Sequence, residues 1–141
     1  MTHPETAPSD YLALAADIKA WGQALGFQQV GISGVELGAA ETRLLDWLAA
    51  GRHGEMDYMA RHGTRRSRPA ELIPGTVRVI SVRMDYLPER AAPTQEVLDD
   101  PQRAFVSRYA LGRDYHKVLR TRLQKLADRI STRVGAFGYR V

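Results

Sequence analysis

Apolar residues recur at the spacing of an amphipathic helix in three parts of the chain. Ser9 or Asp10 is placed to cap the first of these helices, and Gly26 to end it. Gly51 stops the second, and Asp114 is a suitable N-cap for the third. The predicted helices cover residues 11–25, 39–50 and 114–133.

Two runs rich in β-forming residues separate these helices. The first is Phe27–Ser33, with Val30 and Ile32 as its inward-facing pair, and the second is Val77–Tyr86. A further β-run is predicted to begin at Tyr139–Val141. Helices and strands therefore alternate, which predicts a small layered α/β domain, with right-handed crossovers if the strands are parallel.

The remaining segments are expected to be connections. Residues 1–10 are predicted to be a disordered leader, so that residues 11–141 form one domain that is incomplete at its C-terminal end. Residues 54–60 are predicted to form one or two helical turns, and residues 71–75 a turn that leads into a strand. The segment Pro88–Gln102 contains three prolines and several acidic residues, which indicates an exposed loop.

Composition excludes several classes of protein. The 141 residues are 44% hydrophobic, enough for a buried core, yet no stretch is long and apolar enough to span a membrane. The N-terminus lacks the features of a secretory or transit peptide, which predicts a cytoplasmic protein. The chain has no cysteine, so it offers no thiolate to a disulfide, a zinc ion or an iron–sulfur cluster. Its four histidines form no familiar metal-binding pair.

Charge is distributed unevenly along the chain. Residues 1–102 hold 10 Lys or Arg and 14 Asp or Glu, a net charge of −4, whereas residues 103–141 hold 10 basic and 2 acidic residues, a net charge of +8. Such segregation indicates an anionic partner, with nucleic acid as the first candidate. A solvated, arginine-rich helix face is the alternative, and charge does not decide between them.

Two segments carry candidate binding residues. Four arginines, including Arg66, lie between Arg61 and Arg68, and their guanidinium groups suit phosphate or amide oxygens. The alternative is a surface loop whose arginines pair with nearby carboxylates. The run Ser107–Lys117 combines hydroxyl, guanidinium, phenol and imidazole groups directly before a helix, which favours a ligand site over simple helix capping. His116 in this run is the only candidate for acid–base chemistry near neutral pH, although a surface role is the simpler interpretation.

Several stretches together resemble the N-terminal part of epoxyqueuosine reductases, the cobalamin-dependent iron–sulfur enzymes of tRNA queuosine biosynthesis. The resemblance runs from about Tyr11 to Val141, and its most specific piece is Ser-Arg-Tyr-Ala-Leu-Gly-Arg-Asp-Tyr-His-Lys at 107–117. The other stretches are GFQQVGI at 26–32, LDWLAAGRHGEMDYM at 45–59, Arg65-Arg66 before Pro69, and ELIPG at 71–75 leading into VISV at 79–82.

The resemblance implies a cobalamin-binding domain that is followed, in the whole enzyme, by a ferredoxin-like module with two 4Fe-4S clusters and by helical repeats. In that family, electrons from an unidentified donor pass through the clusters to cobalamin, and the epoxide of epoxyqueuosine in the tRNA wobble position is reduced. The family's proton-donating aspartate and cluster cysteines would lie beyond Val141. This chain is therefore expected to bind no cluster and to be inactive alone.

The resemblance also implies positions for corrinoid contacts. Arg66 and Ser107 match positions at which the family contacts the corrinoid, and Arg108, Tyr109 and Tyr115 lie in the same neighbourhood. The competing hypothesis, from a different class, is a stand-alone basic module that binds structured RNA without catalysis.

Overall fold

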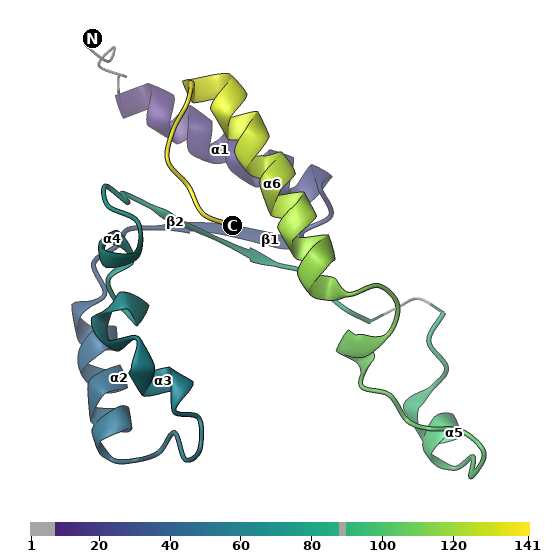
Figure 1. The fold of residues 1–141 in the computed structure, drawn as a ribbon. Helices are drawn as coiled ribbons and strands as arrows, with labels where there is room; N and C mark the ends of the chain where they lie inside the picture. The colour runs from purple at the N-terminus through teal and green to yellow at the C-terminus, as the bar shows by residue number, and fades with distance from the viewer. Residues whose placement is uncertain (1–7, 88–89) are drawn as a thin grey trace. The chain divides into compact units, whose positions relative to one another are not determined.

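The computed structural model describes residues 8–87 and 90–141, which form two compact units (Figure 1). The first unit comprises the described parts of residues 1–30, 82–135 and 141, and the second comprises residues 31–81 and 136–140. In chain order the elements are α1 (Pro8–Ala24), β1 (Gln29–Ser33), α2 (Gly38–Ala49), α3 (Tyr58–Arg61), the 3-10 helix η1 (Gly63–Arg66), α4 (Pro69–Leu72), β2 (Val79–Arg83), α5 (Thr94–Leu98), the 3-10 helix η2 (Arg108–Ala110) and α6 (Tyr115–Val134).

The core of the first unit lies where α1 packs against α6 (Figure 1). It consists of five buried apolar residues: Ile18, Phe27, Leu126, Ala127 and Ile130. Leu126 and Ala127 lie four and three positions before Ile130, so the three buried residues of α6 share one face of the helix and leave most of its basic residues on the other. The predicted amphipathic pattern therefore positions α6 with its charged face toward water.

Two glycines of this unit allow close approaches that a side chain would block. A Cβ atom at Gly22 would lie 2.4 Å from Cγ2 of Val30, so this glycine lets the start of β1 pack against α1. Gly26 has a φ of +86°, which L-residues rarely adopt, and Nη1 of Arg122 donates to its carbonyl at 3.1 Å. Arg122 thereby links the end of α1 to α6.

The second unit is held together by polar contacts more than by a hydrophobic core. The apolar stripe of α2 is only half-buried at Leu44, Trp47 and Leu48. The most buried polar residue among those described is Ser67, directly after η1, and it donates to the carboxylate of Glu41 in α2 at 2.6 Å. The short helices η1 and α4 therefore depend on this bond for their position relative to α2.

β1 and β2 pair as a two-stranded antiparallel sheet. Gln28 N donates to the carbonyl of Arg83 at 2.9 Å, and Asp85 N donates to the side-chain oxygen of Gln28 at 2.7 Å. Val30 and Ile32 are the half-buried residues of β1, as the alternation predicts. Because the strands are antiparallel, the right-handed crossover rule for parallel strands does not apply to them.

The predicted α/β class is confirmed, with differences in detail. Helix α1 begins at Pro8, so Ser9 and Asp10 lie within its first turn instead of before it, and residues 8–10 are helical where a disordered leader was predicted. Residues 1–7 of that leader lie outside the described part of the chain. Asp114 caps α6 as predicted, its carboxylate accepting from His116 N at 3.0 Å.

The secondary structure of two segments was predicted wrongly. The segment predicted as a loop from Pro88 to Gln102 contains α5, because Thr94–Leu98 has five residues without proline that can close a helical turn. Tyr139–Val141 is not a strand, since it pairs with neither β1 nor β2. Local β propensity does not form a strand without a partner for the backbone hydrogen bonds.

No helix within the described residues is both long enough and apolar enough to cross a membrane.

Candidate functional site

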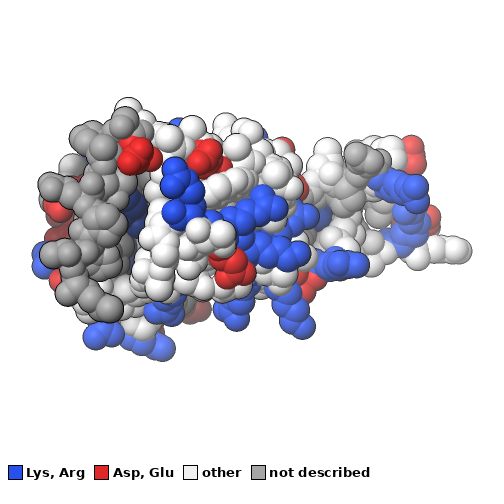
Figure 2. Space-filling view, turned by 90° about the horizontal axis from the view of Figure 1, so that it is seen from above, with Lys and Arg blue, Asp and Glu red and all other residues white. Residues whose placement is uncertain are grey.

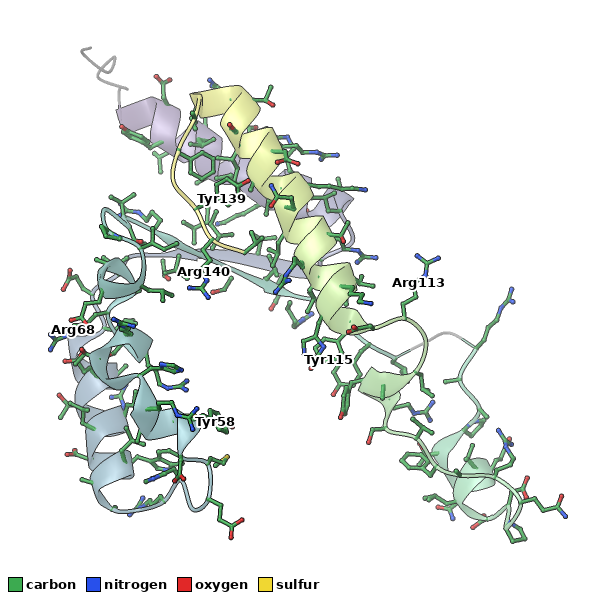
Figure 3. The ribbon with its side chains drawn as sticks, in the orientation of Figure 1. Tyr58, Arg68, Arg113, Tyr115, Tyr139 and Arg140 are labelled. Carbon is green, nitrogen blue, oxygen red and sulfur yellow. The ribbon has the colours of Figure 1, made fainter. Side chains whose placement is uncertain are left out.

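The two tyrosines predicted to form part of a binding site share one hollow in the first unit. This tyrosine hollow, of about 220 Å³, is lined by Met84, Asp85, Tyr86, Leu87, Tyr109, Leu111, Arg113, Tyr115 and Val118. It brings together the chain after β2, the segment around η2, and the first turn of α6. Figure 3 shows Arg113 and Tyr115 at this end of α6.

Aromatic contacts shape the tyrosine hollow. The rings of Tyr109 and Tyr115 meet edge to face, with centroids 5.8 Å apart. Tyr115 also stacks on the imidazole of His116 at 4.0 Å. Tyr109 is 53% exposed, so one wall of the hollow offers a phenol ring to a ligand without losing a core contact. Edge-to-face pairs of this kind fix the angle between two rings.

The start of α6 is held by the Asp114 carboxylate. The backbone N–H of His116 donates to this carboxylate, and Nδ1 of the same residue lies 3.1 Å from it. These hydrogen bonds from His116 lower the pKa of Asp114, because they favour its charged form. The imidazole thus contacts the Asp114 carboxylate and the Tyr115 ring. It is also exposed, which agrees with a surface role for His116.

Arg108 faces a second hollow of the first unit. This arginine hollow, of about 380 Å³, is lined by Arg90, Ala91, Ala92, Val97, Arg103, Ala104, Phe105, Val106, Arg108, Leu111 and Gly112. Nη2 of Arg108 donates to Oγ1 of Thr94 in α5 at 2.7 Å. Leu111 lines both hollows, so they adjoin. Ser107 lines neither hollow; its carbonyl accepts from Ala110 N at 2.9 Å and opens η2.

Arg66 lies in the second unit, where its side chain contacts Tyr58. Its guanidinium donates to the carbonyl of Tyr58, and its Cζ lies 5.7 Å from the centroid of the Tyr58 ring. Both contacts leave the side chain exposed. Neighbouring Arg65 is exposed as well, and its side chain forms no hydrogen bond or ion pair with a described residue. Arg66 and Arg65 therefore differ in their side-chain interactions, although the clustering of arginines in the sequence did not distinguish them.

Arg68 has a structural role. It forms a forked pair with Glu41, with Nη2 2.8 Å from Oε1 and Nε 3.0 Å from Oε2. Hydrogen bonds from Arg68 and Ser67 lower the pKa of Glu41 from its ordinary 4.5 to about 2. The same carboxylate raises the pKa of Arg68, which also lies 3.3 Å from Glu71. Figure 3 shows Arg68 beside the short helices η1 and α4.

Sequence reasoning missed Glu41, because it precedes its partner by 27 residues and no local motif connects them. It also missed the lining residues contributed by the chain after β2, Met84 to Leu87. Arg113 and Leu111, by contrast, lie within the run 107–117 that the sequence singled out.

The exposed face of α6 carries the positive charge predicted for the C-terminal part of the chain. Its exposed cations are Lys117, Arg120, Lys125, Arg129 and Arg133, and they span roughly 24 Å of helix axis. None of the five forms an ion pair with a described residue. Figure 2 shows several Lys and Arg side chains close together on the face seen from above, with few Asp or Glu side chains between them. Arg122 differs from the five because it is half-buried against Gly26 and Met84.

The chemistry of the tyrosine hollow suits the edge of a corrinoid. A corrin ring is a flat, largely apolar macrocycle rimmed by amides, and this hollow combines apolar and phenolic walls with one guanidinium, that of Arg113, and one carboxylate, that of Asp85. Its volume covers only part of such a ring. No group of three or more metal-binding side chains occurs within the described residues.

Comparison with known proteins identifies relatives for nearly the whole chain. Residues 66–141 match the family described as "Epoxyqueuosine reductase QueG, DUF1730". A protein named epoxyqueuosine reductase from Pseudomonas aeruginosa is 65% identical over 134 residues, which are 95% of this chain and 37% of that protein. Proteins of the same name from Alicycliphilus denitrificans and Vibrio cholerae are 60% and 56% identical, over 91% and 93% of this chain and 37% and 35% of their own lengths.

No solved structure matches the chain significantly. The chain spans little more than a third of the length of these curated relatives and aligns with their N-terminal part. The family match nevertheless covers more than half of this chain, including η2, both hollows' shared residue Leu111, and α6. The resemblance predicted from the sequence is confirmed: the chain belongs to the epoxyqueuosine reductase family.

Proposed function

We propose that this chain forms the cobalamin-binding part of an enzyme that reduces epoxyqueuosine to queuosine in tRNA. The observation that carries the proposal is the tyrosine hollow, to which the run 107–117 contributes Tyr109, Leu111, Arg113 and Tyr115 and whose walls suit a corrinoid. Family membership supplies the reaction class, because the relatives are named for this reduction.

The proposed cofactor contacts divide into two groups. Tyr109 and Tyr115 would lie against the macrocycle from the tyrosine hollow, with Ser107 and Arg108 at the adjoining turn of η2. The family resemblance also makes Arg66 a proposed cofactor contact, through a charge-assisted hydrogen bond to an amide or the phosphate. Its bond to the Tyr58 carbonyl uses one nitrogen, Nη2, so other guanidinium hydrogens remain available to a ligand.

When bound, cobalamin would supply the electrons that remove the epoxide oxygen. The chain's own residues would orient the macrocycle by holding part of its edge. The rigid Asp114 cap and the Tyr109–Tyr115 contact support that role, since orientation requires side chains with fixed positions. The 4Fe-4S clusters of the family would be held elsewhere in the protein, because this chain has no cysteine.

The same proposal assigns a tRNA partner, a cytoplasmic location and an electron donor whose identity the chain does not indicate. The five exposed cations of α6 support the tRNA partner, because each lysine or arginine that reaches a phosphate adds affinity and salt sensitivity. A stand-alone RNA-binding module remains the second candidate, and the same basic face favours it.

Cobalamin binding distinguishes the two candidates. Cob(II)alamin would be mixed with the intact protein, its visible absorption recorded, and retained cobalamin measured after desalting. The proposed function predicts a changed spectrum and cobalamin that is retained with the protein. RNA binding with an unchanged spectrum and no retained cobalamin would instead support the RNA-binding module.

A further inference from the structure

The arginine hollow has an unbalanced positive charge. Among the described residues, Arg90, Arg103 and Arg108 line it, and no described aspartate or glutamate does. Of the described carboxylates close to these residues in the sequence, Asp99 accepts from Gln95 at 2.7 Å and Asp100 accepts from Gln102 N at 2.9 Å, while Glu96 is exposed and is not part of the lining. An anionic group would therefore meet guanidinium groups in this hollow without competition from its walls.

The rest of the lining is apolar and exposed to water. Phe105 is 44% exposed, Val106 46% and Leu111 37%. Small side chains at Ala91, Ala92 and Ala104 leave room between these walls. At about 380 Å³ the hollow lies at the small end of the range for ligand pockets, roughly 300–1,000 Å³. It suits a small, flat group that is also attached to an anion.

One wall of the hollow is tied in place. The bond from Arg108 to Thr94 joins η2 to the start of α5, two segments separated by 14 residues. Arg108 is half-buried, whereas Arg90 and Arg103 are exposed. Arg108 therefore shapes the hollow, and the two exposed arginines are free to move toward a ligand at its rim.

We infer that the arginine hollow binds one unstacked nucleotide of a single-stranded segment of RNA. The base would stack on Phe105, and Arg90 and Arg103 would contact the flanking phosphates. Proteins read single-stranded RNA in this way, by placing splayed bases on aromatic side chains and phosphates on cations. A duplex has no unstacked base to offer, so the hollow would favour loops over stems.

This inference rests on the proposed function, because it names where the tRNA substrate of that function is held. Since Leu111 lines both hollows, a nucleotide in the arginine hollow would lie next to a cofactor in the tyrosine hollow. The five cations of α6 are not part of the hollow and would contribute affinity that does not depend on strandedness.

The test measures the dissociation constants of the intact protein for two RNA probes, a hairpin with a single-stranded loop and a loop-free duplex of equal length. Phe105→Ala is expected to weaken hairpin binding about tenfold or more while leaving duplex binding unchanged, because stacking is lost. Phe105→Trp is expected to restore hairpin affinity, and the fluorescence of the introduced indole should be quenched by the loop RNA. Phe137→Ala, at an aromatic residue of the second unit, is the matched control and should change neither constant.

A second comparison tests the phosphate contacts. Arg103→Ala is expected to reduce the slope of log K against log salt by about 0.7 for the hairpin. Arg78→Ala removes the same charge from an exposed residue outside the hollow and should leave the slope nearly unchanged.

The outcomes separate the inference from the proposed function. If the wild-type protein binds the hairpin and Phe105→Ala, Phe105→Trp and Arg103→Ala all bind it equally well, the inference is wrong and the proposed function stands. If Phe105→Ala instead abolishes cobalamin retention and leaves RNA binding intact, the hollow belongs to the cofactor and the inference is also wrong. If the wild-type protein binds neither RNA, both the inference and the proposed tRNA partner are overturned.

Discussion

Replacing Arg66 by alanine tests the assignment of cofactor contacts to the second unit. The change removes a guanidinium that donates to the Tyr58 carbonyl and lies over the Tyr58 ring at 5.7 Å. Both contacts are exposed, so their loss should lower the free energy of unfolding by only about 0.5–1 kcal/mol. Folding should therefore survive the substitution, and a larger effect on cobalamin can be attributed to the ligand.

The expected effect on cobalamin is larger. A hydrogen bond from a charged donor is typically worth about 1.5–3 kcal/mol, which corresponds to a loss of roughly ten- to a hundredfold in affinity. Arg65→Ala provides a matched control, because Arg65 occupies the same 3-10 helix, is also exposed, and its side chain makes no hydrogen bond or ion pair with a described residue. Cobalamin affinity should be unchanged in that variant.

Lys125→Ala completes the comparison from the basic face of α6. It should leave cobalamin affinity unchanged, weaken tRNA binding modestly and reduce the salt slope by about one phosphate contact. Cobalamin and tRNA would be titrated separately into the intact protein and each variant. Equal losses of cobalamin affinity in Arg66→Ala and Lys125→Ala would indicate general destabilisation and refute the assignment. A loss restricted to tRNA in both variants would show that the Arg61–Arg68 loop serves the nucleic acid.

Three further predictions concern the fold that supports the site. Wild-type stability should fall as pH drops from about 4.5 toward 2, because the folded protein depresses the pKa of Glu41 and its pairing with Arg68 is lost on protonation. In urea titrations at a series of pH values in this range, the unfolding midpoint of Glu41→Gln should change less than that of the wild type. Identical pH profiles for the two proteins would contradict the role of the pair. Leu126→Ala should lower the free energy of unfolding by about 2–5 kcal/mol, since Leu126 is 2% exposed, whereas Leu12→Ala at a 76% exposed position should cost far less in the same urea titration. Gly22→Ala should cost about 1–3 kcal/mol, because its Cβ would overlap Val30, and an unchanged melting temperature would show that α1 and β1 pack less closely than described.

Local sequence signals predicted most of the regular structure. The helical spacing of residues 114–133 and the Asp114 cap predicted α6 to within about a residue at each end, because capping and amphipathicity are local properties. Tyr139–Val141 was predicted wrongly for the opposite reason. A strand depends on a partner that local sequence does not specify, and this segment pairs with neither strand of the sheet.

The candidate site was predictable only in part. The run 107–117 was identified because polar and aromatic groups are dense in it, and Tyr109 and Tyr115 do share a hollow. The role of Arg68 was not predictable, because its partner Glu41 lies 27 residues away in the sequence. A cluster of arginines looks uniform in sequence, yet in the structure Arg68 pairs with Glu41 and Glu71, while Arg65 and Arg66 form no ion pair with a described residue. Long-range pairing of this kind is determined by tertiary packing.

The most direct test of the account is the conversion of epoxyqueuosine in tRNA. The purified full-length enzyme that contains this chain, supplied with cob(II)alamin and a chemical reductant, would be incubated with tRNA that carries epoxyqueuosine, and the nucleosides would be analysed by mass spectrometry. The account predicts a modified nucleoside that has lost one oxygen atom, with conversion strongly reduced in a Tyr109→Ala, Tyr115→Ala double variant that still folds. Unchanged conversion in that variant would contradict the placement of the cofactor in the tyrosine hollow, and no conversion by cobalamin-loaded wild-type protein would contradict the proposed reaction.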